Sequence, residues 1–478
     1  MASGVRDLAA RHSREGGNPV TWPRGNVPGQ SRWVPAFAGM TAGALRAIFG
    51  GMLSALLLAS CTRDKDETVI RFWAMGREAE VVAQFMPEFE RANPGIRVDL
   101  QHIPWTSAHE KLLTAFAADS LPDICQLGNT WIPEFAALNT LEPLQSYVDA
   151  SKVIEPADYF PGIWDTNLID GQLLGVPWYV DTRLVFYRKD MLAKAGFKSP
   201  PKNWAEWERA MAAVKRDVGP QRYAVMLPLN EFEQQLSFAL QQDDPLLRDG
   251  GGRGNFRSPG FRRALAFYAN TFKQGWAPPM SETQISNVWD EFFNGFYAFY
   301  VSGPWNIREF RKRAPPQLAH AWGTMPLPGP GDGPGAGIAS GTSLVLFRSS
   351  PHKQASWKLV EFLSRPDIQQ RFHAEIGDLP PRRSTWEHPT LANDEYAKAF
   401  RDQLERVKPT PKVLEWERIV QEMRLATERV VRGGESQDKA VRELDARVDA
   451  ILEKRRWMTE RDRQAAGTAA AKPRAATR

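Results

Sequence analysis

The sequence lacks features on which several classes of protein depend. Its 478 residues include only two cysteines, Cys61 and Cys125, so no disulfide framework is indicated. No basic run with interleaved aromatic residues occurs, which argues against a nucleic-acid partner. The glycine-rich stretch 243–255, DDPLLRDGGGRGN, is not followed by the Gly-Lys-Ser/Thr of a phosphate-binding loop. Disulfide-stapled, nucleic-acid-binding and P-loop proteins are therefore poor descriptions of this chain.

An excess of one charge is also missing once the N-terminal stretch is set aside. The formal net charge is +5, but residues 1–60 hold six Arg against two acidic residues, which leaves 55 basic and 54 acidic residues elsewhere. Hydrophobic residues make up 42% and charged residues 24%, as in soluble globular proteins. A chain this long outgrows a single core, so two lobes are expected. The 17 Trp, several outside apolar periodicity, favour a surface that stacks on a ligand.

The first 60 residues differ in character from the rest. Residues 1–39 are rich in Gly, Pro and Arg without helical or strand periodicity, and we interpret them as a non-native extension that precedes a true start at Met40. Residues 40–60 are predicted to be a signal peptide. In it Arg46 precedes an apolar run, 47–59, that is short for a membrane-spanning helix.

The end of this segment, Leu58-Ala59-Ser60-Cys61, resembles a bacterial lipobox. In such a motif the cysteine becomes the lipidated first residue of the mature protein, so Cys61 is the expected lipid anchor. The alternative is a plain secretory signal cut nearby. Polar residues 61–67 would form the tether, and the protein would be periplasmic and lipid-anchored to a bacterial membrane.

A βαβ unit follows the tether. Residues 68–73 alternate as a strand, residues 80–92 have the period of an amphipathic helix, and residues 96–103 form a second strand after a turn. This order implies a parallel sheet in an α/β structure. Because ligands bind at the carboxyl ends of such strands, Glu78 is a candidate ligand residue. The alternative is a solvated carboxylate favoured by the helix dipole.

Polar residues interrupt an otherwise apolar strand predicted at residues 179–187. Trp178, Asp181 and Arg183 lie at or just before the run Leu184-Val185-Phe186. Asp and Arg are rarely buried unless they are paired. The sequence therefore predicts either an ion pair between Asp181 and Arg183 at a strand end, or a ligand site with an aromatic face beside an acid and a base.

Further candidate ligand residues follow other predicted strands and turns. They have side chains suited to hydrogen bonding or stacking, or a glycine backbone that can approach a ligand closely. These candidates are Asn129, Thr130, Glu231, Trp305, Gly341, Thr342 and Arg382. Core packing is the alternative for Trp305, and a solvated surface position is the alternative for Arg382.

Three motifs together carry a family resemblance. They are PWYVDTRLVFYRKD (177–190), GNTW (128–131) and SGPW (302–305). The chain from about Asp66 to about Met458 resembles the family 1 extracellular solute-binding proteins that serve sugar ABC importers, of the maltose/trehalose type. Several motifs agree in order along the chain, which makes the resemblance more specific than any one of them.

The resemblance implies a bilobal α/β periplasmic-binding-protein fold, type II-like, with two mixed sheets flanked by helices and a hinge. The chain would cross between the lobes in the 177–190 motif, in the Pro/Gly-rich linker 327–337 and in GDLPPRRS, 377–384. The resulting division places 68–178 and 338–378 in lobe 1, and 179–330 and 384–458 in lobe 2. The Ala-, Arg- and Lys-rich tail, 459–478, is expected to be disordered.

The implied function is capture of a small oligosaccharide, with an α-glucoside such as maltose or trehalose as the leading candidate, and delivery to the permease subunits. Trp178 and Trp305 would stack on the sugar. The resemblance implies a monomer that binds without catalysis, cofactor or metal.

Two other functions remain open from the sequence. A glycoside hydrolase could use two of Glu78, Asp181 and Glu231 as acid and base, although no feature fixes their separation. A binding protein for a polyol, a glycerol phosphate ester or a peptide is the other alternative. A phosphate would need clustered basic groups, and Arg183 and Arg382 leave that open.

Overall fold

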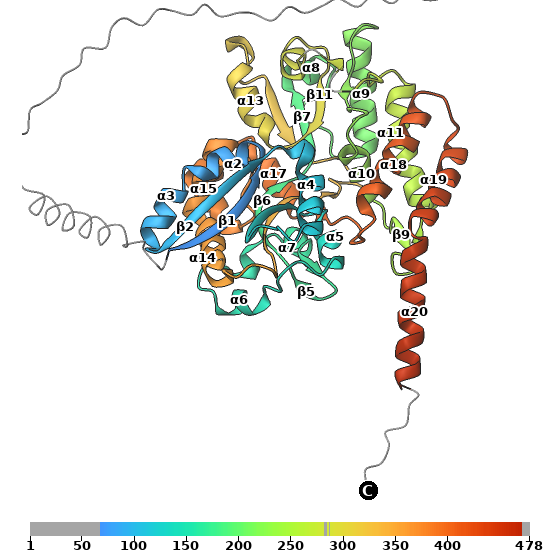
Figure 1. Cartoon of the computed structure of the whole chain (residues 1–478). Coiled ribbons are helices and arrows are strands. Elements are labelled where there is room, and N and C mark those ends of the chain that lie inside the picture. Colours follow the sequence, from blue (N-terminus) through green and yellow to red (C-terminus); the bar gives the residue numbers. More distant parts are fainter. Residues whose placement is uncertain (1–66, 282–283, 286, 471–478) are drawn as a thin grey trace, which may run out of the picture. The chain divides into compact units, whose positions relative to one another are not determined.

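The computed structural model describes residues 67–281, 284–285 and 287–470 (Figure 1). The expected N-terminal extension, the signal peptide and Cys61 lie outside the described residues. Within the described part of the chain, no helix is both long and apolar enough to cross a membrane.

The first sheet has five strands in the order β2-β1-β3-β14-β6. Its strands are β1 (Thr68–Met75), β2 (Ile96–Ile103), β3 (Ile124–Gly128), β6 (Val176–Asp181) and β14 (Ser340–Leu346). β1 runs parallel to β2 and β3, whereas β14 runs antiparallel to β3 and β6. The βαβ unit predicted from periodicity is confirmed, with β2 beginning and ending where the sequence placed it.

The helix of that unit is interrupted. The single helix predicted over residues 80–92 is two helices, α2 (Gly76–Ala83) and α3 (Met86–Ala92). Pro87 lies in the first turn of α3, where a missing backbone N–H is tolerated. An earlier start for α2 brings Glu78 into its first turn.

The second sheet has four strands in the order β12-β7-β11-β8. They are β7 (Leu184–Arg188), β8 (Val225–Met226), β11 (Phe299–Ser302) and β12 (Trp322–Met325). β7 is antiparallel to β11 and β12, and β11 is parallel to β8, so this sheet is also mixed.

The chain passes between the two sheets at three places. At the first, the predicted continuous strand over 179–187 is wrong, because β6 ends at Asp181 in one sheet and β7 begins at Leu184 in the other. Residues 179–181, which the sequence placed in lobe 2, therefore complete a strand of lobe 1. The second passage joins β12 to β14, and the third follows α15 (Pro366–Ile376).

Helices cover both sheets (Figure 1). Four hydrophobic clusters result, two around each sheet. The helices on the first sheet include α4 (Trp105–Ala117), α14 (Lys353–Ser364) and α15. Those on the second include α9 (Trp204–Val218), α10 (Glu233–Leu240), α11 (Pro259–Lys273), α12 (Val288–Phe293), α13 (Trp305–Arg313), α17 (Ala397–Leu404), α18 (Trp416–Val431) and α19 (Gln437–Ile451).

Shorter elements connect these parts of the fold. They are α5 (Ile132–Ala137), α6 (Gln145–Ala150), α7 (Pro161–Asp165), β4 (Leu168–Ile169), β5 (Gln172–Leu173), α8 (Lys189–Lys194), β9 (Leu247–Arg248), β10 (Arg253–Gly254), β13 (Gly337–Ile338), α16 (Pro389–Ala392) and β15 (Val407–Lys408).

The C-terminal segment departs from the prediction of a disordered tail. Helix α20 (Glu453–Ala470) extends well past residue 459. Its sequence is rich in Ala and Arg, which are strong helix formers, so the composition that suggested disorder also favours a helix. The last eight residues, 471–478, lie outside the described part of the chain.

Candidate ligand-binding cleft

A cavity of about 540 Å³ is lined by residues of both lobes and of the passages between them. Its lining comprises Glu78, Trp105, Gly128, Asn129, Thr130, Trp131, Tyr179, Asp181, Phe232, Glu233, Trp305, Ile338, Ser340, Gly341, Thr342, Asp378 and Glu417. A surface hollow of similar volume near Asp243 and Lys408 has no aromatic residue in its lining. The first cavity thus combines apolar faces with many hydrogen-bonding groups.

Two parallel strands direct their carboxyl ends at this cavity. Glu78 follows β1, while Asn129 and Thr130 follow β3, as expected for an α/β sheet. Glu78 is buried and accepts hydrogen bonds from the Tyr179 hydroxyl at 2.7 Å and from Trp105 Nε1 at 3.3 Å. Burial raises the pKa of Glu78, although these two hydrogen bonds lower it in part. The alternative of a solvated helix-start carboxylate is therefore wrong.

The second turn is held by contacts across the sheet. Asn129 Nδ2 donates to the Ala339 carbonyl at 3.0 Å. Burial raises the pKa of Glu417 at the start of α18, and a hydrogen bond with Thr130 opposes that rise. Thr130 belongs to lobe 1 and Glu417 to a lobe 2 helix, so this contact links the two lobes.

Gly341 lies where backbone must approach backbone. Its φ is +128°, and a Cβ there would lie 2.4 Å from the Tyr179 carbonyl oxygen, so a side chain is strained on both counts. The neighbouring Thr342 is buried and lines the cavity, and its hydroxyl forms no hydrogen bond of normal geometry.

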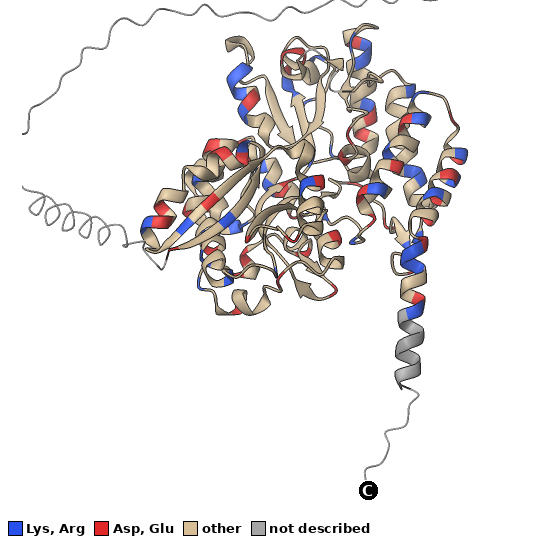
Figure 2. Ribbon diagram, in the orientation of Figure 1, with Lys and Arg blue, Asp and Glu red and all other residues tan. Residues whose placement is uncertain are grey.

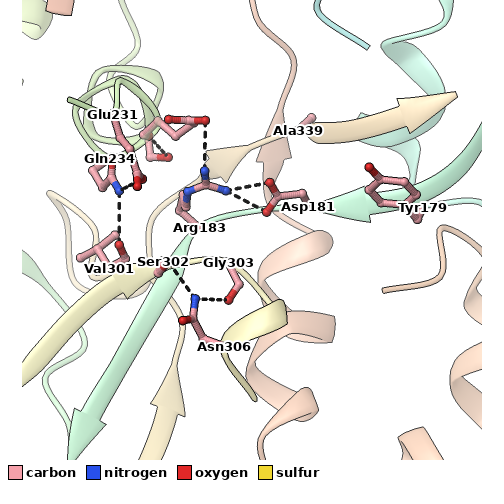
Figure 3. A network of polar contacts seen from close by, with 12 residues as sticks. Tyr179, Asp181, Arg183, Glu231, Gln234, Val301, Ser302, Gly303, Asn306 and Ala339 are labelled. Carbon is pink, nitrogen blue, oxygen red and sulfur yellow. Dashed lines mark hydrogen bonds and ion pairs between the residues drawn. The ribbon is translucent and has the colours of Figure 1, made fainter. Parts of the chain in front are cut away.

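Trp305 lies on the cavity wall, where the sequence predicted a ligand contact. Its indole packs against the turn before α13, so closely that a Cβ on Gly303 would lie only 2.0 Å from the ring. Asn306 holds this turn by donating to Ser302 Oγ at 2.9 Å and to the Gly303 carbonyl at 3.1 Å (Figure 3). The core-packing alternative for Trp305 does not describe its position.

Trp178 does not line the cavity, which corrects the expectation that it stacks on a ligand. It is 2% exposed, and its ring centroid lies 4.8 Å from that of Phe372 and 6.2 Å from that of Phe72 in the lobe 1 core. The next residue, Tyr179, lines the cavity instead. A one-residue difference of register decides which of two adjacent aromatic residues faces a ligand, and the sequence could not resolve it.

Arg183 joins two carboxylates of the cavity wall without lining the cavity itself. Its Nη1 donates to both oxygens of Asp181, at 2.8 and 2.7 Å (Figure 3). Its Nη2 lies 3.0 Å from Glu233. The Trp305 ring centroid is 5.1 Å from the guanidinium carbon. The predicted pair therefore forms, and Asp181 alone of the two faces the cavity.

The charge states in this group follow from burial and pairing. Burial raises the pKa of Asp181, and Arg183 opposes that rise. Burial works to lower the pKa of Arg183, but Asp181, Glu233 and Glu231 raise it above its usual value. The guanidinium thus stays charged and fixes the orientation of its two partners.

Two other predicted ligand residues are placed elsewhere. Glu231 accepts from Gln234 Nε2 at 2.5 Å, and Glu233, rather than Glu231, lines the cavity. Arg382 is 6% exposed and donates to Asp158 at 2.6 Å and to the carbonyls of Val153 and Ser364 at 2.9 and 2.7 Å. The solvated alternative for Arg382 is equally wrong, because its side chain is buried and donates to Asp158 and to two backbone carbonyls.

Several lining residues were missed by sequence reasoning. Those with aromatic or carboxyl side chains are Trp105, Trp131, Tyr179, Phe232, Glu233, Asp378 and Glu417. Trp131 and Tyr179 belong to the motifs that carry the family resemblance, and Asp378 lies in the expected third crossing, 377–384, so these segments could have indicated them. Glu417 had no local signal, because it starts a helix far along the chain. Among the described residues, no group of three or more His, Cys, Asp or Glu is arranged to hold a metal ion.

Comparisons with known proteins agree on one family. Residues 76–370 match the family model of the bacterial extracellular solute-binding proteins, so the chain belongs to that family. It is similar to the solved sugar-binding protein MalE from Xanthomonas citri, with 71% identity, a TM-score of 0.80 and coverage of 82% of this chain and 99% of that one. The expected family and bilobal fold are thereby confirmed.

More distant relatives have the same architecture. A solved ABC-transporter solute-binding protein from Thermotoga lettingae, bound with α-D-tagatose, is 26% identical, with a TM-score of 0.68 and coverage of 80% of this chain and 100% of that one. A putative binding protein of Brucella abortus is 25% identical over 415 residues, covering 84% of this chain and 98% of its own.

Proposed function

We propose that this protein is the substrate-binding component of a sugar ABC importer, which captures a small oligosaccharide between its lobes and delivers it to the permease. The carrying observation is the cavity, in which five aromatic residues stand among polar side chains of both lobes. A sugar ring presents an apolar C–H face to aromatic rings and hydroxyls at its edge to polar groups. The volume of the cavity, about 540 Å³, lies in the usual range for small-molecule sites.

The favoured ligand class is an α-glucoside such as maltose or trehalose. Membership of the family and the similarity to the X. citri sugar-binding protein support a sugar. The lining contains no Lys, Arg or His, which speaks against a glycerol phosphate ester. A polyol or a peptide remains an outcome that the binding test can reveal.

Binding without catalysis is part of the proposal. Of the three acids that a hydrolase was expected to use, Glu231 does not line the cavity, and Asp181 is engaged by Arg183. The cavity carboxylates serve as hydrogen-bond acceptors for sugar hydroxyls. Incubation of the protein with each bound sugar, followed by chromatography, should return the sugar intact.

Calorimetry with maltose, trehalose, a polyol, a glycerol phosphate ester and a short peptide tests the ligand class. We expect saturable binding of at least one α-glucoside and a raised melting temperature, because a ligand that binds only the folded state stabilises it. Binding of the polyol, the phosphate ester or the peptide alone would overturn the sugar assignment.

The proposed location is the periplasm, with a lipid on Cys61. Full-length protein expressed in a bacterial host should partition into detergent, and Cys61→Ser should move it to the aqueous phase. Mass spectrometry that finds an unmodified mature N-terminus at another residue would contradict the anchor.

A further inference from the structure

The charges that line the cavity are all of one sign. Five of the lining residues are Asp or Glu, and none is Lys, Arg or His. Elsewhere in the described chain, basic and acidic residues are interspersed on the helices of both lobes (Figure 2). Arg183 stands behind the wall and shares its single charge between Asp181 and Glu233. The cavity therefore carries an excess of carboxyl groups over cations.

Three of these acids influence one another. Glu78 follows β1, Asp181 ends β6, and Asp378 lies just after α15 on the third passage between the lobes. Burial raises the pKa of Asp378 well above its usual value, and the charges of Glu78 and Asp181 raise it further. Among the described residues, neither Glu78 nor Asp378 forms an ion pair, and the charge of His102 acts on Glu78 only as a minor influence that lowers its pKa.

An unsatisfied hydroxyl faces the same cavity. Thr342 is 4% exposed, and its Oγ1 forms no hydrogen bond of normal geometry, although it lies near enough to the Tyr179 hydroxyl to lower the pKa of Tyr179. It lies opposite Tyr179, whose hydroxyl donates to Glu78. A buried hydroxyl without a well-formed hydrogen bond is unfavourable, so this oxygen indicates a ligand that forms hydrogen bonds here.

We propose that the cavity selects glycosides that carry an ammonium group and discriminates against sugars that carry a carboxylate or a phosphate. This inference rests on the proposed sugar-binding function and names its ligand class more narrowly. An ammonium group has three donors and no acceptor, which matches carboxyl oxygens and the Thr342 oxygen. Its positive charge also favours the ionised form of carboxyl groups whose pKa burial has raised. Aromatic faces also attract cations. An anionic sugar would bring a like charge to the acidic lining.

Matched sugars test the proposal by calorimetry. Maltose and trehalose are each compared with their 2-amino-2-deoxy derivatives, with the N-acetylated forms, and with trehalose 6-phosphate. We expect the amines to bind about tenfold to a hundredfold more tightly than the parent sugars, because charge-assisted hydrogen bonds are the stronger ones. The N-acetylated forms should lose this advantage, and the phosphate ester should bind most weakly. Added salt should narrow the difference between amine and parent sugar.

The outcomes separate this inference from the proposed function. Parent sugars that bind as tightly as their amines overturn the charge selectivity and leave sugar capture intact. Amines that bind when both parent sugars fail support the selectivity and overturn the assignment to neutral α-glucosides. Absence of binding by every probe overturns both.

Variants locate the selectivity within the cavity. Asp378→Asn should remove most of the amine preference while changing affinity for the parent sugar only several-fold, because the amide still forms hydrogen bonds. Asp332→Asn, at an exposed acid in the linker, is the matched control and should leave the preference unchanged. Glu78→Gln provides a second test, with folding checked by circular dichroism. If neither cavity variant changes the ratio of the two affinities, the proposal is wrong.

Discussion

Arg183 and Arg382 are both buried and both paired, yet they do different things. The donors of Arg382 meet Asp158 and two backbone carbonyls, and Arg382 does not line the ligand cavity. The donors of Arg183 meet Asp181 and Glu233, which themselves line it. The tryptophans divide similarly, since Trp178 lies in the core and Trp305 on the cavity wall. What a buried polar or aromatic residue does thus depends on whether its partners face the ligand.

The largest effect is expected from Trp178, the tryptophan in the lobe 1 core. Trp178→Ala should reduce the free energy of unfolding by about 3–5 kcal/mol, because it leaves a cavity among Phe72, Tyr179 and Phe372. Sugar affinity of the folded fraction should change little. Urea unfolding and calorimetry measure the two quantities separately. A stable variant with weakened binding would place Trp178 in the site after all.

A similar loss of stability is expected when Arg382, the arginine away from the cavity, is replaced. Arg382→Ala removes one member of a buried ion pair and should cost about 3–5 kcal/mol of unfolding free energy. Its effect on affinity should be small. Arg383→Ala removes the neighbouring arginine, which is more exposed and pairs with Glu405, and should cost about 1 kcal/mol or less. Equal losses for the two variants would contradict the distinction.

The cavity-side arginine should affect binding as well. Arg183→Gln leaves Asp181 and Glu233 without their shared cation, so sugar affinity should fall several-fold to a thousandfold. Asp181→Asn should reduce the affinity by a factor in the same range. Arg183→Lys keeps the charge and should recover part of the affinity. Calorimetry on folded protein checks this, and wild-type affinity in both Arg183→Gln and Asp181→Asn would make the pair purely structural.

Trp305→Ala should change affinity alone. Losing the stacking face should weaken sugar binding by about 1–3 kcal/mol with little change in the melting temperature. Trp305→Phe keeps an aromatic face and serves as the conservative comparison. Unchanged affinity in Trp305→Ala would remove this residue from the site.

The smallest effect concerns the stability of the protein in acid, to which Asp158, the partner of Arg382, contributes. Burial opposes ionisation of Asp158, but hydrogen bonds from Ser384 and Arg382 lower its pKa below the usual value. A carboxyl with a lowered folded-state pKa stabilises above the unfolded-state value, about pH 4, and this contribution is lost as pH falls through the folded-state pKa. Asp158→Asn should therefore flatten the loss of stability on acidification. Urea midpoints measured from neutral pH downwards test this, and identical slopes for wild type and variant would contradict it.

The βαβ unit, the family and the bilobal architecture were predictable because each depends on local periodicity or on a contiguous motif. The strand break at Thr182 and Arg183 was not predictable, since the apolar runs on either side of the polar residues fit one interrupted strand as well as two strands that join different sheets. The role of Arg382 was not predictable either, because it depends on Asp158, a partner more than two hundred residues away. Local pattern gives elements and motifs, whereas the choice between core and cavity depends on tertiary contacts.

The break between β6 and β7 also has a mechanical consequence. It places Arg183 on the first passage between the lobes, and a group near the axis of a hinge rotation is displaced far less than one at the rim. The guanidinium and the carboxylates beside it should therefore keep their arrangement while Glu417 and Thr130, on opposite lobes, separate and meet again. An arriving sugar would then meet an acceptor array that is already ordered, so little of the binding free energy would be spent on arranging it.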